Sequence, residues 1–207
     1  QTAITEQLRK EGAFIHFEED PTMIPTDVDF VVYTPAIHPD HLEFRYFKEK
    51  EIPIYKRSQV LGNLAKGHPT IAVAGTHGKT TTTSMLTQIL FGSGLDISAF
   101  IGGKLPVING SGRAGTSDIM TCEACEFVDT FLKLYPDVAV ILNIDADHLD
   151  YFKTVDNIIK SFNKFCNNTT KAIIYNGDDE NTVKAVSSVS GKEKITFGLS
   201  EKNDFYP

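Results

Sequence analysis

One stretch decides the fold of this chain: Thr70-Ile71-Ala72-Val73-Ala74-Gly75-Thr76-His77-Gly78-Lys79-Thr80-Thr81. An apolar, β-branched run enters a turn bracketed by two glycines, and a helical pattern over 79–92 follows. Strand, glycine loop and helix N-terminus in that order form an anion site, because backbone N–H groups and the helix dipole both favour negative charge. In such loops a lysine reaches phosphate oxygens and the next hydroxyl ligates Mg²⁺. The stretch therefore predicts a nucleotide-phosphate site that uses Lys79 and Thr80.

Outside this stretch, short apolar runs alternate with helical patterns, which is typical of an α/β fold with a mostly parallel, doubly wound sheet. We expect strands near residues 13–17, 28–33, 52–55, 69–74, 97–101, 117–122, 137–142, 171–175 and 193–197. We expect helices near residues 2–11, 40–50, 57–66, 79–92, 127–134, 154–167 and 179–187. A helix end at Lys66-Gly67 with Pro69 after it predicts a boundary between domains at 1–68 and 69–207.

Composition narrows the classes of function. The 207 residues carry 27 acidic and 20 basic side chains, a formal charge of −7, which argues against a nucleic-acid-binding protein. The longest aliphatic run, Val138–Leu142, is far shorter than the ~20 residues of a membrane span, so we expect no membrane insertion. Three cysteines are an odd count for a disulfide scaffold and favour a reducing cytoplasm. Cys122 and Cys125 have metal-site spacing, but no second pair completes a zinc site.

Polar clusters follow two of the predicted strands. Glu123-Ala124-Cys125-Glu126 comes after strand 117–122, and Asn143-Ile144-Asp145-Ala146-Asp147-His148 comes after strand 137–142. In a doubly wound sheet, ligands bind outside the carboxyl ends of the strands, where the phosphate loop also lies. A carboxylate and an imidazole beside a triphosphate could bind a divalent cation. The alternative is an acidic, solvated loop that caps a helix.

The loop Gly75-Thr76-His77-Gly78-Lys79-Thr80-Thr81 resembles the ATP-binding loop of the Mur ligases, the amide-forming enzymes of peptidoglycan precursor synthesis. It is shorter than the standard phosphate loop, which has a glycine where this chain has Val73. Most relatives, including folylpolyglutamate synthases, carry Asn at the position of His77. The His form is similar to the members that act on UDP-N-acetylmuramate with L-alanine, or that recycle murein tripeptide.

The resemblance extends to the metal site. The stretch from Asn143 to His148 resembles the family's Asn-x-x-x-Asp-His segment, and Glu123 lies 25 residues before His148, where the family has a metal-binding glutamate. It implies that Thr80, Glu123 and His148 ligate Mg²⁺, that Asn143 belongs to the nucleotide site, and that Asp147 orients His148. Lys79, Glu123 and His148 would be the catalytic residues. The segment after Glu123 departs from the family, so the role of Glu126 stays open between site residue and exposed helix start.

Two turns resemble substrate-binding turns of the same family. Thr34-Pro35-Ala36-Ile37 is similar to the turn that approaches the UDP part of the substrate, with Thr34 and Ala36 as candidates. Ile101-Gly102-Gly103 resembles a turn near the muramyl group. Both could also be ordinary connections of an α/β protein.

The resemblance implies an ATP- and Mg²⁺-dependent ligase that joins L-alanine to UDP-N-acetylmuramate through an acyl phosphate. It implies a partial Rossmann-like domain at 1–68, without its first strand and Gly-x-Gly loop, and a truncated central domain at 69–207. We therefore expect about half of a larger enzyme, inactive alone. The rival in another class is a nucleotide switch, which needs a guanine-reading Asn-Lys-x-Asp that Asn163-Lys164-Phe165-Cys166 does not complete.

Overall fold

The computed structural model describes residues 2–34 and 36–207. The chain divides into two compact units, Gln1–Val60 and Leu61–Pro207. This division falls inside helix α3 (Arg57–Ala65), before the boundary that we predicted at residue 68, and that predicted boundary stays a proposal. No helix among the described residues is both long and apolar enough to cross a membrane.

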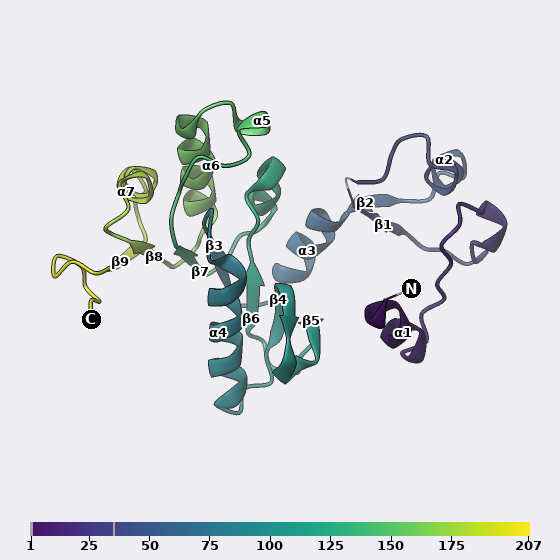
Figure 1. Cartoon of the computed structure of the whole chain (residues 1–207), viewed down its shortest axis with the longest axis horizontal. Helices are drawn as coiled ribbons and strands as arrows, with labels where there is room; N and C mark the ends of the chain where they lie inside the picture. The colour runs from purple at the N-terminus through teal and green to yellow at the C-terminus, as the bar shows by residue number, and fades with distance from the viewer. Residues whose placement is uncertain (1, 35) are drawn as a thin grey trace. The chain divides into compact units, whose positions relative to one another are not determined.

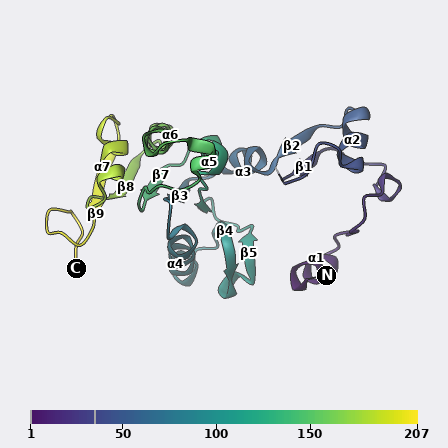
Figure 2. The same ribbon diagram turned by 45° about the horizontal axis from the view of Figure 1, so that its top comes forward.

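The first unit is built around two short parallel strands, β1 (Val31–Tyr33) and β2 (Ile54–Lys56), in which Val31 pairs with Ile54. Helix α2 (Leu42–Glu49) connects them, and its Phe44 ring lies 5.1 Å from that of Tyr33. The chain enters through α1 (Ala3–Lys10) and a 3₁₀ turn, η1 (Pro21–Met23). Figure 2 shows the strand, helix and strand in succession.

The predicted strand at 13–17 is wrong, because these residues are irregular. The run is apolar, but Phe14 and Phe17 are 67% and 59% exposed, so they do not anchor a buried face. Arg9 holds the segment instead: its guanidinium donates to the carbonyl of Ile15 and lies over the ring of Phe17. A run of strand-forming residues does not become a strand when no neighbouring strand is there to pair with it.

The second unit contains a seven-stranded sheet in the order β5-β4-β6-β3-β7-β8-β9 (Figure 1). Its strands are β3 (Thr70–Ala74), β4 (Ser98–Leu105), β5 (Gly110–Arg113), β6 (Met120–Glu123), β7 (Val138–Ile141), β8 (Ala172–Asn176) and β9 (Glu193–Phe197). All pairings are parallel except that of β4 with β5. The mostly parallel α/β sheet that we predicted is therefore confirmed. Strand β3 is central, between β6 and β7, which brings three strand ends to one place.

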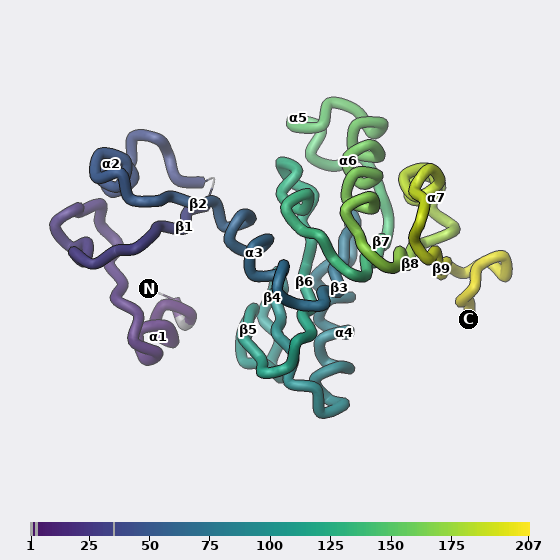
Figure 3. The backbone as a smooth tube through the Cα atoms, turned by 180° about the vertical axis from the view of Figure 1, so that it is seen from behind, coloured from purple at the N-terminus to yellow at the C-terminus, as the bar shows by residue number. Residues whose placement is uncertain are grey.

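Helices cover both faces of this sheet. In Figure 2, α4 (Lys79–Gly92) lies below the sheet and α6 (Val155–Asn168) lies above it, with α7 (Glu180–Ser187) beside α6. The tube in Figure 3 shows the same layers from behind. Phe131, Phe162 and Phe165 form the aromatic centre of the core, with the Phe131 ring stacked on Phe165 at 4.7 Å.

Three local features differ from the predictions. The predicted turn at Ile101-Gly102-Gly103 is instead part of β4, which runs on to Leu105 and pairs with the unpredicted strand β5. The predicted helix at 127–134 is a 3₁₀ segment, η3 (Phe127–Lys133), broken by left-handed residues at Val128 and Asp129. Two further short elements, η2 (Pro106–Ile108) and α5 (Leu149–Phe152), carried no clear pattern in the sequence.

Candidate functional site

The phosphate loop connects β3 to α4, and its two glycines are required by its shape. Gly75 has φ 148° and Gly78 has φ 85°, values that residues with a side chain rarely adopt. A Cβ at Gly75 would also lie 3.0 Å from Cβ of Leu142, at the end of β7. Helix α4 starts directly at Lys79, so its unpaired N-terminal N–H groups open onto the loop. This geometry suits a phosphate group.

Asn143 braces the loop. Its side-chain oxygen accepts from His77 N at 2.8 Å, and its side-chain nitrogen donates to His77 O at 3.1 Å. Its own carbonyl accepts from Thr76 N at 3.0 Å. Thr76 is tied further, because its hydroxyl accepts from Asp145 N at 2.9 Å. Both polar groups of the Asn143 amide are therefore hydrogen-bonded to the backbone of His77.

Lys79 folds back over the loop. Its ammonium donates to Gly75 O at 2.6 Å, to Thr76 O at 3.1 Å and to the Glu126 carboxylate, whose two oxygens lie 3.0 and 2.9 Å away. Glu126 lies between β6 and η3, and its side chain is only 3% exposed. Of the two readings left open for Glu126, exposed helix start and site residue, the first is wrong, because its carboxylate is buried against Lys79.

Thr80 and Glu123 also come together. The Thr80 hydroxyl donates to Glu123 Oε1 at 3.0 Å, and Glu123 Oε2 accepts from Gly102 N at 2.7 Å. A Cβ at Gly102 would lie 2.5 Å from Glu123 Oε1, and one at Gly103 would lie 3.0 Å from Cγ2 of Thr80. The two glycines of β4 therefore leave the space that the side chains of Thr80 and Glu123 occupy.

His148 takes a left-handed backbone conformation, φ 50°, just before α5. Its ring lies 4.7 Å from the ring of Phe127, and its Nε2 is 3.8 Å from the Asp147 carboxylate. No hydrogen bond in the described part of the chain joins His148 to Glu123 or Thr80. The structure thus brings two of the three predicted metal ligands, Thr80 and Glu123, into contact. The third, His148, lies instead against Phe127 and Asp147.

The donor set partly fits Mg²⁺. Thr80 and Glu123 offer adjacent oxygens, which this ion prefers, and its remaining positions are commonly filled by water and phosphate. Within the described residues, no group of three or more His, Cys, Asp or Glu side chains is arranged to hold a metal ion.

A tyrosine and an aspartate fix the segment next to His148. Tyr151 Oη donates to Asp129 Oδ2 at 2.9 Å, and this hydrogen bond raises the pKa of Tyr151. Ser161 in α6 donates to the other carboxylate oxygen of Asp129. Asp129 thereby ties the left-handed turn of η3 to α5 and α6.

The candidate residues of the first unit lie after β1. Thr34 and Ala36 are exposed, and Ala36 N donates to the Thr34 hydroxyl at 3.5 Å. Pro35 of the predicted turn lies outside the described residues. Thr34 lines a hollow of about 220 Å³ that β1 and α2 enclose, together with His41 and Glu43.

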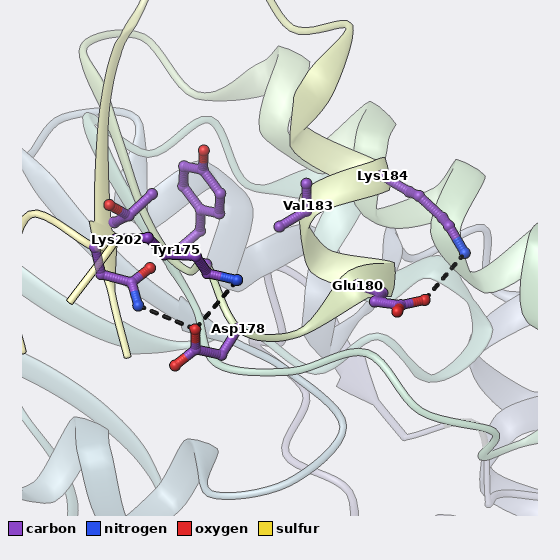
Figure 4. Close-up of a pocket in the computed structure, with 9 residues that line it drawn as sticks. Tyr175, Asp178, Glu180, Val183, Lys184 and Lys202 are labelled. Atoms are coloured by element: carbon purple, nitrogen blue, oxygen red, sulfur yellow. Dashed lines mark hydrogen bonds and ion pairs between the residues drawn. The ribbon is translucent and has the colours of Figure 1, made fainter. Parts of the chain in front are cut away.

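A cavity of about 540 Å³ lies at the ends of β8 and β9, a place where we predicted no site (Figure 4). Asp178 lines it and accepts from Ser200 N, Leu199 N, Asn203 and Lys202. These donors, the Ser200 N–H foremost, lower the pKa of Asp178 to about 2. Its signal in the sequence is the Asn-Gly-Asp-Asp run that follows a strand, which resembles any solvated turn.

The cysteines form neither a disulfide nor a zinc site among the described residues. Cys122 and Cys166 are buried, and burial raises the pKa of each thiol to about 12. Cys125 is exposed beside Glu126.

Two family models match the chain. The model described as "Mur ligase middle domain" covers residues 73–207, and the one described as "Mur ligase family, catalytic domain" covers residues 1–69. A UDP-N-acetylmuramate--L-alanine ligase of Caldanaerobacter subterraneus subsp. tengcongensis is 44% identical over 98% of this chain and 44% of its own length. The chain spans less than half of the length of the first curated relatives that it matches, 43% to 46%.

Solved structures share the fold. The UDP-N-acetylmuramate-alanine ligase of Thermotoga maritima matches 95% of this chain and 45% of its own, with a TM-score of 0.81 at 26% identity. The UDP-N-acetylmuramate:L-alanyl-gamma-D-glutamyl-meso-diaminopimelate ligase from Neisseria meningitides matches 98% of this chain and 68% of its own, with a TM-score of 0.86 at 24% identity. A Thermotoga maritima MurF ligase in complex with ADP matches 89% of this chain and 50% of its own, with a TM-score of 0.60 at 18% identity.

Proposed function

The chain belongs to the Mur ligase family, and on that premise we propose that the whole protein joins L-alanine to UDP-N-acetylmuramate at the expense of ATP. One observation carries the proposal: the glycine loop, Lys79 and the Thr80–Glu123 pair converge at the carboxyl ends of β3 and β6. The name of the 44% identical relative supports the choice of amino acid and substrate.

We propose that residues 69–207 bind ATP and that residues 1–68, through Thr34 and Ala36, bind the UDP part of the substrate. Gly75, Thr76, His77, Gly78, Lys79, Thr80 and Thr81 form the phosphate site, with Asn143 bracing it. Phosphoryl transfer mainly requires positioning and charge neutralisation. Lys79 and the first N–H groups of α4 supply both to the β- and γ-phosphates.

Thr80, Glu123 and His148 would hold Mg²⁺, which supplies further positive charge to the phosphate oxygens. The lactyl carboxylate of the substrate attacks the γ-phosphorus, and ADP leaves. The amine of L-alanine then attacks the acyl phosphate, and phosphate leaves as the amide forms. Within the chain, Lys79 holds the transferred group in place during the first step.

The rival nucleotide switch loses support. Asn163-Lys164-Phe165-Cys166 lies inside α6, where Phe165 and Cys166 are fully buried, and Asn163 donates to Ala185 O at 2.7 Å. A guanine-reading motif has to present its side chains at a ligand site. This segment presents two of them to the core.

The test is ATP-dependent incorporation of alanine by the full-length protein, with Lys79→Ala as the variant. We expect kcat/KM of the variant to fall by about a hundredfold or more. Undiminished activity would refute the assignment of this site. Competition between free alanine and L-Ala-γ-D-Glu-diaminopimelate distinguishes the family members, since preference for the tripeptide indicates the recycling ligase. We also propose that the reaction takes place in the cytoplasm.

A further inference from the structure

Among the described residues, Glu126 is the one charged residue that is buried. Its carboxylate lies against a single cation, the ammonium of Lys79, at 2.9 and 3.0 Å. Burying a carboxylate costs free energy unless it is paired and hydrogen-bonded. Glu126 is also outside the loop motif and outside the three predicted metal ligands, so the proposed chemistry does not explain it.

The ammonium of Lys79 has three protons and three acceptors. Gly75 O, Thr76 O and Glu126 each take one at 3.1 Å or less. Lysine has three donors and no more, so none is left for a phosphate in this arrangement. A phosphate oxygen that binds Lys79 therefore has to replace one of the three acceptors.

Glu126 is the acceptor that a phosphate would replace. The carbonyls of Gly75 and Thr76 lie four and three positions before Lys79 in the same loop, so they stay near the ammonium when the lysine stem rotates, whereas Glu126 is 47 positions away on another segment. Glu126 is the only anion among the three acceptors, and a phosphate is an anion that makes the same kind of short, charge-assisted bond.

We propose that Glu126 is a positioning residue that holds Lys79 back in the nucleotide-free loop, and that a nucleotide phosphate takes the ammonium from it. This inference rests on the proposed function, because it requires Lys79 to bind the phosphates of ATP. It gives the loop an ordered resting state and sets nucleotide affinity below what the loop alone would provide.

Lys79 is the partner that moves. The backbone on the C-terminal side of Glu126 is held by a tight turn, in which Glu126 O accepts from Asp129 N at 2.9 Å and Cys125 O accepts from Phe131 N at 3.0 Å. Lys79 carries its charge on a flexible four-carbon stem. Nucleotide binding thus requires only rotations within one side chain.

The experiment measures binding of MgATP to the full-length protein by calorimetry, for wild type, Glu126→Gln and Glu126→Asp. Glutamine keeps the shape and an acceptor but removes the negative charge that attracts the ammonium of Lys79. We expect Glu126→Gln to bind MgATP about tenfold more tightly, equal to about 1.4 kcal/mol. Aspartate withdraws the carboxylate by one methylene, and we expect a smaller gain.

A purely structural role predicts the opposite sign, because a damaged loop binds less tightly. The matched control is Lys79→Met, alone and with Glu126→Gln: removal of the ammonium should abolish the gain. If Glu126→Gln is folded and binds MgATP equally or more weakly, the inference is overturned. If Glu126→Gln does not fold, an unchanged or weaker affinity of Glu126→Asp overturns it.

The same measurements distinguish a failure of the proposed function from a failure of the inference about Glu126. If wild type and Lys79→Met bind MgATP alike, Lys79 is not a phosphate ligand, and if wild type does not bind MgATP, the proposed ATP site is absent; both proposals fall in either case. If Lys79→Met weakens binding while both Glu126 variants leave it unchanged, the nucleotide site stands and only the role of Glu126 is refuted.

Discussion

Gly102→Ala tests the Thr80–Glu123 pair without altering either residue. The new Cβ would lie 2.5 Å from Glu123 Oε1 and 2.7 Å from Oε2. Ordinary contact begins at 3.4 Å, so the carboxylate has to shift by about 0.9 Å (3.4 − 2.5). The obstacle is the end of a flexible side chain, so we expect the free energy of unfolding to change by less than about 1 kcal/mol.

The functional cost should be much larger. A misplacement of about 1 Å in a site can cost on the order of a hundredfold, and loss of supporting contacts around a metal typically costs ~10–100-fold in affinity. We therefore expect the Mg²⁺-dependent part of ATP binding to weaken by ~10–100-fold, measured as the difference between calorimetric titrations with Mg²⁺ and with EDTA.

Gly112→Ala is the matched control. It lies on the neighbouring strand β5, where the added Cβ would meet Ala99 O at an ordinary 3.5 Å. We expect this variant to bind MgATP as wild type does. The reasoning is refuted if Gly102→Ala retains full Mg²⁺-dependent affinity, or if Gly112→Ala loses as much.

Three further predictions concern stability. Gly62→Ala places a Cβ against the carbonyl oxygen of Lys133, so we expect the free energy of unfolding, measured in urea, to fall by ~1–3 kcal/mol. Gly92→Ala meets no neighbour, so its free energy of unfolding should rise by a few tenths of a kcal/mol, and equal effects of the two variants would contradict the packing argument. Asn143→Ala removes both side-chain bonds to the peptide of His77, and we expect a loss of about 2 kcal/mol together with weaker MgATP binding; unchanged binding would exclude bracing. Hydrogen bonds lower the pKa of Asp178 to about 2, so its contribution to the free energy of unfolding is complete above pH 3.8 and is lost as the pH falls through 2. The difference in unfolding free energy between wild type and Asp178→Asn should shrink across that pH range, and a constant difference would refute this prediction.

The parts of the fold that local sequence specifies were predicted well. The glycine loop between β3 and α4 depends on neighbours in sequence, because its two positive φ values need glycine wherever the chain goes next. The parallel order follows from the alternation of apolar runs and helical patterns. By contrast, Gly110-Ser111-Gly112-Arg113 has almost no strand propensity and becomes β5 only because β4 is there to pair with it.

The side-chain contacts of the site were harder to predict from the sequence. Val128 is β-branched and disfavours the left-handed backbone that it adopts, so no propensity argument predicts the break in η3. Glu126 looked like an ordinary acid near a helix start. Its burial depends on Lys79, which is 47 positions away, and sequence spacing does not reveal such a pairing.

The bonds from Asn143 to the phosphate loop join residues 66 positions apart, and those from Glu123 to Thr80 join residues 43 apart. Closing loops of this length costs entropy before any contact stabilises them, which slows folding. During synthesis, residues 70–92 would therefore leave the ribosome well before they can bind a phosphate. Anion binding would first appear when β7 docks beside β3, so the rate at which a refolding chain acquires MgATP affinity should report the assembly of the sheet.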